Sequence, residues 1–127
     1  MNALLHARVA YANPNDAART PRDIEYRAFA RATRALTESV DAGGAEFAHL
    51  AEALTMNRRL WSALAVDLAG DGNVLPAALR ASLLALAQFV MTHTDKVLNG
   101  DESVQPLIDV NTAIMRGLRG QQQEAAP

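Results

Sequence analysis

Apolar residues in the segment 45–69 recur at alternating intervals of three and four, the seam of a helix that packs lengthwise against other helices. The members of this series are Phe47, Leu50, Leu54, Asn57, Trp61, Leu64 and Leu68. The apolar side chains of a seam this long are buried only if partner helices of comparable length pack against it. The spacing therefore predicts a helical bundle.

Turn signals divide the remainder of the chain into further helices. Pro21 opens one, Gly43 and Gly44 follow it, and Asn99 with Gly100 ends another. The expected helices span residues 3–12, 20–42, 45–69, 76–98 and 103–120. No segment alternates apolar and polar residues as a strand would. We expect an all-α fold, a compact bundle of about five helices in which a short N-terminal helix precedes four longer ones.

One domain accounts for this pattern. The helices fill residues 1–120 without a linker long enough to separate two domains, whereas 121–127 has too little to bury and is expected to be a disordered tail. Segment 76–98 carries two neighbouring apolar stripes, so we expect it to be the central helix. The first stripe consists of Leu79, Leu83, Leu86, Val90, His93 and Val97.

Charge and composition limit the classes of partner and the cell compartments that we expect for this chain. The formal net charge is −2, which gives the whole chain no electrostatic preference for nucleic acid or an acidic membrane. Cysteine is absent, and the N-terminus lacks the pattern of a signal peptide. No apolar run is long enough to span a bilayer. These features are compatible with a cytoplasmic protein, and we expect it not to bind membranes.

No motif points to catalysis or to a cofactor. His6, His49 and His93 lie on three segments, and none forms a ligand pair at metal spacing. The glycines at 70–73 lack the strand and pattern of a phosphate-binding loop. We therefore expect neither an enzyme nor a metal or cofactor site.

Arginines gather on one side of the expected helix 20–42. Arg27, Arg31 and Arg34 lie opposite its apolar stripe. They form either a solvated face, paired with Glu38 and Asp41 one turn away, or a surface for an acidic protein. RNA is a weaker candidate because no aromatic residues that stack on bases lie between the arginines.

Three polar residues occupy seam positions where aliphatic residues are expected. Asn57, His93 and Asn111 must find hydrogen bonds if they are buried. They are either an internal network that sets helix register or the lining of a groove that reads a partner helix.

The segment 57–61 combines the only tryptophan with two arginines. Trp61, Arg58 and Arg59, with Asn57, have the composition of a protein-binding anchor. Core packing is the alternative, and a single tryptophan on a helix seam is more often structural than part of an interface. Arg58 and Arg59 are the better candidates for outward-facing contacts.

Five stretches together resemble the FlaF family of flagellar biosynthesis regulators, in order along nearly the whole chain from Tyr11 to Leu118. They are TPRDIEY at 20–26, FARAT at 29–33, NRRLWSALAVDL at 57–68, HTDKVL at 93–98 and IDVNTAIMRGL at 108–118. The resemblance implies a cytoplasmic protein needed for flagellin production and flagellum assembly, which works opposite a second regulator, FlbT.

Members of this family are thought to bind flagellin, whose terminal segments are amphipathic helices. The resemblance thus implies a chaperone-like regulator that shields such a helix in a groove. Two alternatives remain open: action on flagellin mRNA, directly or through an FlbT-like partner, and a helical homodimerisation module.

Overall fold

The computed structural model describes residues 21–41 and 47–125, and all the regular secondary structure in this part of the chain is helical. Four helices follow one another: α2 Pro21–Asp41, α3 Phe47–Ala69, α4 Ala77–Leu98 and α5 Gln105–Ala125. The all-α prediction is confirmed, and these helices coincide with the four longer ones expected from the sequence. The predicted short helix at 3–12 lies outside the described residues.

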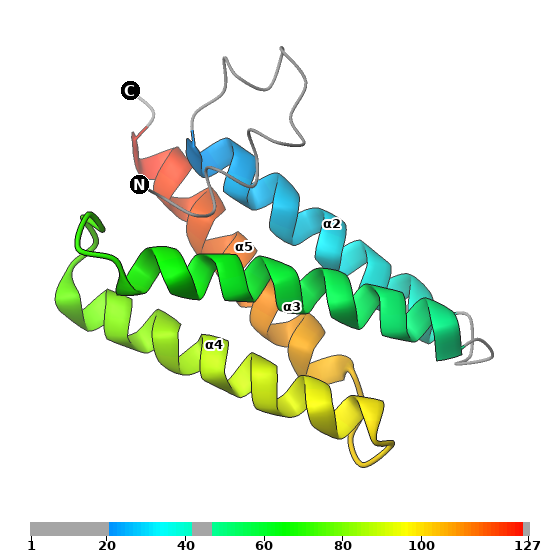
Figure 1. Ribbon diagram of the computed structural model, residues 1–127. Helices are drawn as coiled ribbons and strands as arrows, with labels where there is room; N and C mark the ends of the chain where they lie inside the picture. The colour runs from blue at the N-terminus through cyan, green and yellow to red at the C-terminus, as the bar shows by residue number, and fades with distance from the viewer. Residues whose placement is uncertain (1–20, 42–46, 126–127) are drawn as a thin grey trace.

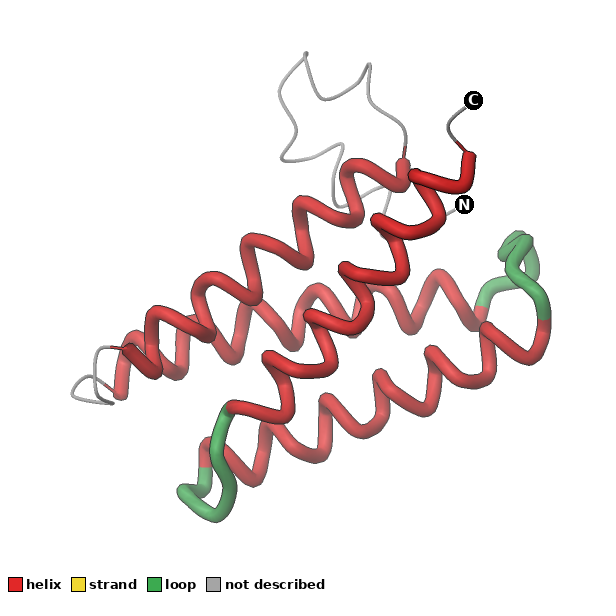
Figure 2. The backbone as a smooth tube through the Cα atoms, turned by 180° about the vertical axis from the view of Figure 1, so that it is seen from behind, coloured by secondary structure: helices red, strands yellow, loops and turns green. Residues whose placement is uncertain are grey.

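The helices form two layers. Helices α3 and α4 make an antiparallel hairpin, and α2 and α5 pack together behind it (Figure 1). Seen from behind, α5 runs obliquely across the bundle, from the C-terminal end of α4 toward the N-terminal end of α2 (Figure 2). As a result α5 packs along α2 and contacts α4 only slightly.

Helix α3 is the central element, since it packs against both α2 and α4. The expectation that segment 76–98 is central was wrong: α4 lies at the edge of the bundle (Figure 1). Its apolar circumference exceeds what α3 and the first turns of α5 cover. Leu79 and Phe89 consequently remain 39% and 41% exposed.

The core is built from all four described helices. The seam of α3 is buried from Leu54 to Leu68, as its spacing predicted, but Phe47 at its start is 61% exposed. Arg58 of α3 faces Asp95 of α4, so the first turns of α3 extend past the end of α4. The largest fully buried apolar side chains are Trp61, Phe29, Leu36, Leu54, Leu68, Leu107 and Val90.

Local signals set most helix ends. Helix α4 stops where Gly100 adopts a φ of 81°, and Asp101 N–H donates to Lys96 O at 2.9 Å, which closes a Schellman motif. Helix α5 begins at Gln105, two residues after the start of the expected range 103–120, and continues to Ala125. It therefore includes residues 121–125, which the sequence analysis assigned to a disordered tail. Glutamine, glutamate and alanine are good helix formers, and nothing in this stretch breaks the helix.

Candidate partner-binding site

A chain of side-chain hydrogen bonds joins α3 to α5 inside the bundle. Trp61 Nε1 donates to Asn111 Oδ1 at 2.9 Å, and Asn111 Nδ2 donates to Asn57 Oδ1 at 2.8 Å. All three residues are fully buried. An indole N–H can only donate, so the tryptophan dictates which way both amides point. The chain of bonds ends at Asn57 Nδ2, which meets no hydrogen-bond acceptor.

This network accounts for two of the three polar seam residues. The structure brings Asn57 and Asn111 together, and Trp61 also packs edge-on against Phe29 with ring centroids 5.5 Å apart. In this conformation Trp61, Asn57 and Asn111 offer no surface to a partner. Their geometry corresponds to the internal register-setting network, which was one of the two expectations for these residues.

His93 lies apart from that network. Its Nε2 donates to the carbonyl oxygen of Ser103 at 2.8 Å, and its ring stacks on Phe89 with centroids 5.2 Å apart. The residue is 6% exposed. His93 thus ties the connection between α4 and α5 back onto α4, which is a structural role at the point where the two helices meet.

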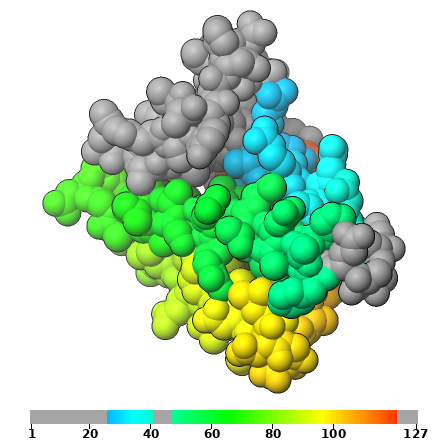
Figure 3. Space-filling model, turned by 45° about the vertical axis from the view of Figure 1, so that its right-hand side comes forward, coloured from blue at the N-terminus to red at the C-terminus, as the bar shows by residue number. Residues whose placement is uncertain are grey.

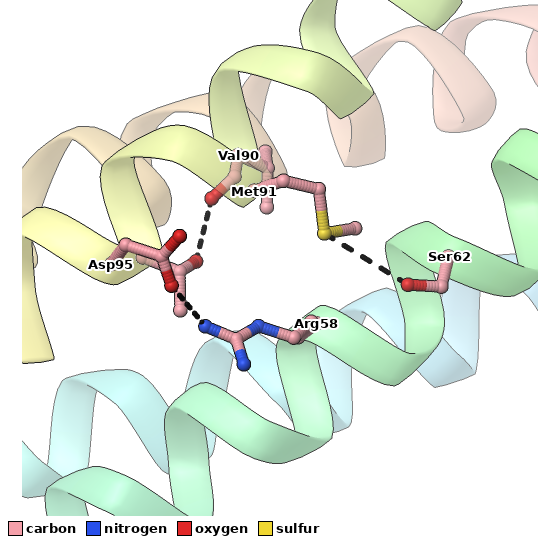
Figure 4. Close-up of polar contacts among 6 residues, drawn as sticks. Arg58, Ser62, Val90, Met91 and Asp95 are labelled. Atoms are coloured by element: carbon pink, nitrogen blue, oxygen red, sulfur yellow. Dashed lines mark hydrogen bonds and ion pairs between the residues drawn. The ribbon is translucent and has the colours of Figure 1, made fainter.

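The two arginines beside Trp61 behave differently from one another. Arg58 donates to Asp95 Oδ1 at 2.7 Å, which links α3 to α4, and the nearby Ser62 lies 3.9 Å from the Met91 sulfur (Figure 4). Both members of the ion pair are substantially exposed, at 40% and 70% of their side chains. Arg59 is exposed, as expected for an outward-facing residue.

The arginines of α2 lie on its outer side. Arg27, Arg31 and Arg34 are all exposed, opposite the buried Phe29 and Leu36. No ion pair or hydrogen bond engages Arg31 or Arg34 within the described chain, and the expected pairing of Arg34 with Glu38 is not formed. Among the described side chains, Arg31 and Arg34 therefore lack the ion pairs with acidic neighbours that the solvated-face interpretation included.

The sequence analysis missed an exposed apolar surface on α4. We define the α4 apolar surface as Leu75, Leu79, Leu83, Leu86 and Phe89. The last four lie on one side of α4, and Leu75 lies two residues before the helix begins. Leu75 is 37% exposed, and Leu83 and Leu86 are half-buried. This surface shares Leu79, Leu83 and Leu86 with the apolar stripe predicted from the sequence, which continues through Val90, His93 and Val97. The whole stripe was interpreted as core because the sequence does not show where the helix that covers it diverges.

The described residues contain no group of three or more potential metal ligands, and none of their helices is long and apolar enough to cross a membrane.

Comparison with known proteins gives one match. A family model, flagellar protein FlaF, matches residues 7–118. Neither the curated proteins nor the solved structures contain a match. Since the family model covers most of the chain and all but the end of the described bundle, the resemblance found in the sequence is confirmed: the chain belongs to the FlaF family of flagellar proteins.

Proposed function

We propose that this flagellar protein binds flagellin in the cytoplasm and thereby promotes flagellin synthesis or secretion and flagellum assembly. It acts as a chaperone-like regulator and not as an enzyme. An amphipathic terminal helix of flagellin docks on the α4 apolar surface.

The observation that carries this proposal is the change in exposure along one stripe of α4. Val90 is fully buried, whereas Leu79, three turns earlier on the same side, is 39% exposed. The covered half meets the start of α5, and the uncovered half lies where α5 has diverged (Figure 2). A further apolar helix laid along the uncovered half would continue the packing that α5 begins.

The chemistry of the occupant follows from this surface. Leucine and phenylalanine side chains at helical spacing accept the apolar face of another helix, with anchors three and four residues apart. Unassembled flagellin is expected to expose such a face, which invites aggregation until it is covered. Trp61 is no longer an anchor in this mechanism, because it lies in the core.

The test uses purified full-length protein and flagellin monomer, with complex formation followed by size exclusion and calorimetry. The variant L79S/F89S should weaken the complex at least tenfold, because two contacts of about 1 kcal/mol or more each are removed. F47S is the matched control, since Phe47 is 61% exposed and lies at the opposite end of the hairpin. It should bind like the native protein.

The alternatives give different results in the same experiment. Absence of a flagellin complex with the native protein, or equal losses in L79S/F89S and F47S, contradicts the docking mechanism. A dimeric native protein that L79S/F89S converts to monomer instead supports the homodimerisation module. Action on flagellin mRNA, directly or through an FlbT-like regulator, predicts an interaction that weakens steeply with salt, whereas an apolar helix contact persists.

A further inference from the structure

Helix α5 carries an apolar face of its own on the side of the bundle where α4 lies. We define the α5 face as Val110, Ile114 and Gly117, which are spaced by four and then three residues. Helices α4 and α5 meet where His93 bonds to Ser103, and they diverge from there (Figure 2). The distance between the two helices therefore increases toward the N-terminal end of α4, where the α4 apolar surface is exposed.

Two contacts fix the orientation of α5. Asn111 Nδ2 donates to Asn57 of α3, and the Arg119 guanidinium donates to the Tyr26 hydroxyl of α2. At about 100° per residue, Arg119 lies about 80° to one side of Asn111, whereas the α5 face lies about 60–120° to the other side. Helices α2 and α4 pack on different sides of α3 (Figure 1), and α3 lies between them in the space-filling view (Figure 3). The α5 face is therefore turned away from α2 and toward α4.

The α4 apolar surface is turned toward α5 in the same way. Met91 marks the side of α4 that packs on α3, because its sulfur lies 3.9 Å from the Ser62 hydroxyl. Phe89 lies about 160° around the helix from Met91. Its ring stacks on His93, whose Nε2 donates to the Ser103 carbonyl just before α5 begins. The two apolar faces thus lie on either side of the region into which α5 does not extend.

The residues of these faces select an uncharged occupant. Val110 and Ile114 are half-buried, and Gly117 is exposed. A Cβ added at Gly117 would meet no atom within 4 Å, so another helix can approach this turn of α5 closely. Arg80, the only charged residue of α4 before Asp95, lies on the side of α4 that faces α3. An occupant that contacts both faces buries no charge of α4 and needs apolar residues over a wider arc than a single seam.

We propose that the amphipathic helix docked on the α4 apolar surface also packs against the α5 face, so that it lies between α4 and α5 as a further helix of the bundle. This inference rests on the proposed function and adds the α5 face to its binding site. The occupant continues the apolar contact that α4 and α5 make with each other where they meet. It has two neighbouring apolar stripes, one for each helix, whereas a helix with one narrow seam contacts α4 alone.

The experiment measures the affinity of flagellin monomer for the full-length chain by calorimetry. Gly117→Trp places a bulky side chain on the α5 face. Gly120→Trp is the matched control, because it makes the same change about one turn later, on the outer side of α5, about 180° from Asn111. A Cβ at either glycine meets no atom within 4 Å, so both variants should fold, and circular dichroism checks this. Gly117→Ala tests whether the loss of affinity depends on the size of the side chain.

Gly117→Trp should weaken the complex about tenfold or more, because a bulky side chain in a packed contact forces the docked helix away, whereas Gly117→Ala and Gly120→Trp should each change the affinity less than about twofold. Photocrosslinking identifies the occupant. The photoreactive residue p-benzoylphenylalanine replaces either Gly117 or Ser82, which is exposed on α4 two turns before Phe89. Both positions should crosslink to the same terminal helix of flagellin.

The outcomes separate this inference from the proposed function. A complex that L79S/F89S weakens but Gly117→Trp does not, or equal losses in Gly117→Trp and Gly120→Trp, overturns the inference and leaves the proposed function standing. Crosslinks from position 117 to a second copy of the chain, or to another segment of the same chain, also overturn it. If the native protein forms no complex with flagellin, the proposed function fails, and the inference fails with it.

Discussion

The direction of the buried hydrogen bonds makes a sharp prediction about the two asparagines. Replacing Asn111 with leucine, N111L, removes the acceptor of the Trp61 indole and the donor to Asn57 Oδ1. Two buried polar groups then lose their partners. Replacing Asn57 with leucine, N57L, leaves Asn111 Nδ2 without its acceptor. The same change removes Asn57 Nδ2, which already lacks an acceptor.

These counts convert to free energies of unfolding. A buried polar group without a hydrogen bond costs about 1–3 kcal/mol, so N111L should destabilise the protein by about 2–6 kcal/mol. N57L adds one such group and removes another, and its cost on this account is near zero. In the double variant N57L/N111L only the Trp61 indole N–H loses its acceptor, and the unsatisfied Asn57 Nδ2 is again removed. It should therefore be more stable than N111L alone.

The assay is urea unfolding followed by far-ultraviolet circular dichroism, because Trp61 fluorescence is itself altered when its partner changes. The three variants and the native protein form a double-mutant cycle, which isolates the coupling between the two asparagines. The reasoning is refuted if N57L destabilises as much as N111L, or if the double variant loses the sum of the two single losses.

Three further changes test other parts of the fold. F29A removes the ring that packs edge-on against Trp61 at 5.5 Å, and it should cost about 3–5 kcal/mol in urea unfolding; a loss under 1 kcal/mol would contradict the assigned core. R58A breaks the exposed ion pair with Asp95 and should change the unfolding free energy by less than about 1 kcal/mol, so a larger loss would show a stronger contact than its exposure implies. G100A places a side chain at a φ of 81° and should lower the melting temperature by several degrees, about 1 kcal/mol; an unchanged melting temperature would argue against the left-handed turn.

Much of the fold could be predicted because its signals are local. The ends of α2 and α4 follow from Pro21 and Gly100, residues whose backbone preferences act within one turn. The seam of α3 follows from the helical repeat, since residues three and four apart share a side. Arg27, Arg31 and Arg34 were expected to point outward for the same reason, and they do.

The candidate site was harder to predict. The seam spacing of Trp61 is identical for an anchor and for a core residue, so spacing alone does not separate the two. Its burial depends on Phe29 and Asn111, which are contributed by α2 and α5 from distant parts of the sequence. Similarly, Asn57, His93 and Asn111 all occupy seam positions, but only the packing shows that two of them bond to each other while the third bonds to Ser103.

By itself, the sequence determined the all-α class, the places where the four described helices begin and end to within a few residues, and membership of the FlaF family. Those properties depend on backbone preferences and on residue order. Only the tertiary structure decided which part of the α4 stripe is core and which is surface. Val90 is fully buried and Leu79 is 39% exposed, although both lie on the same side of one helix, and α5 starts beside the C-terminal end of α4 and diverges from its N-terminal end (Figure 2). A helix records in its sequence that one side is apolar, but where the neighbouring helix diverges is set by the packing of the whole bundle.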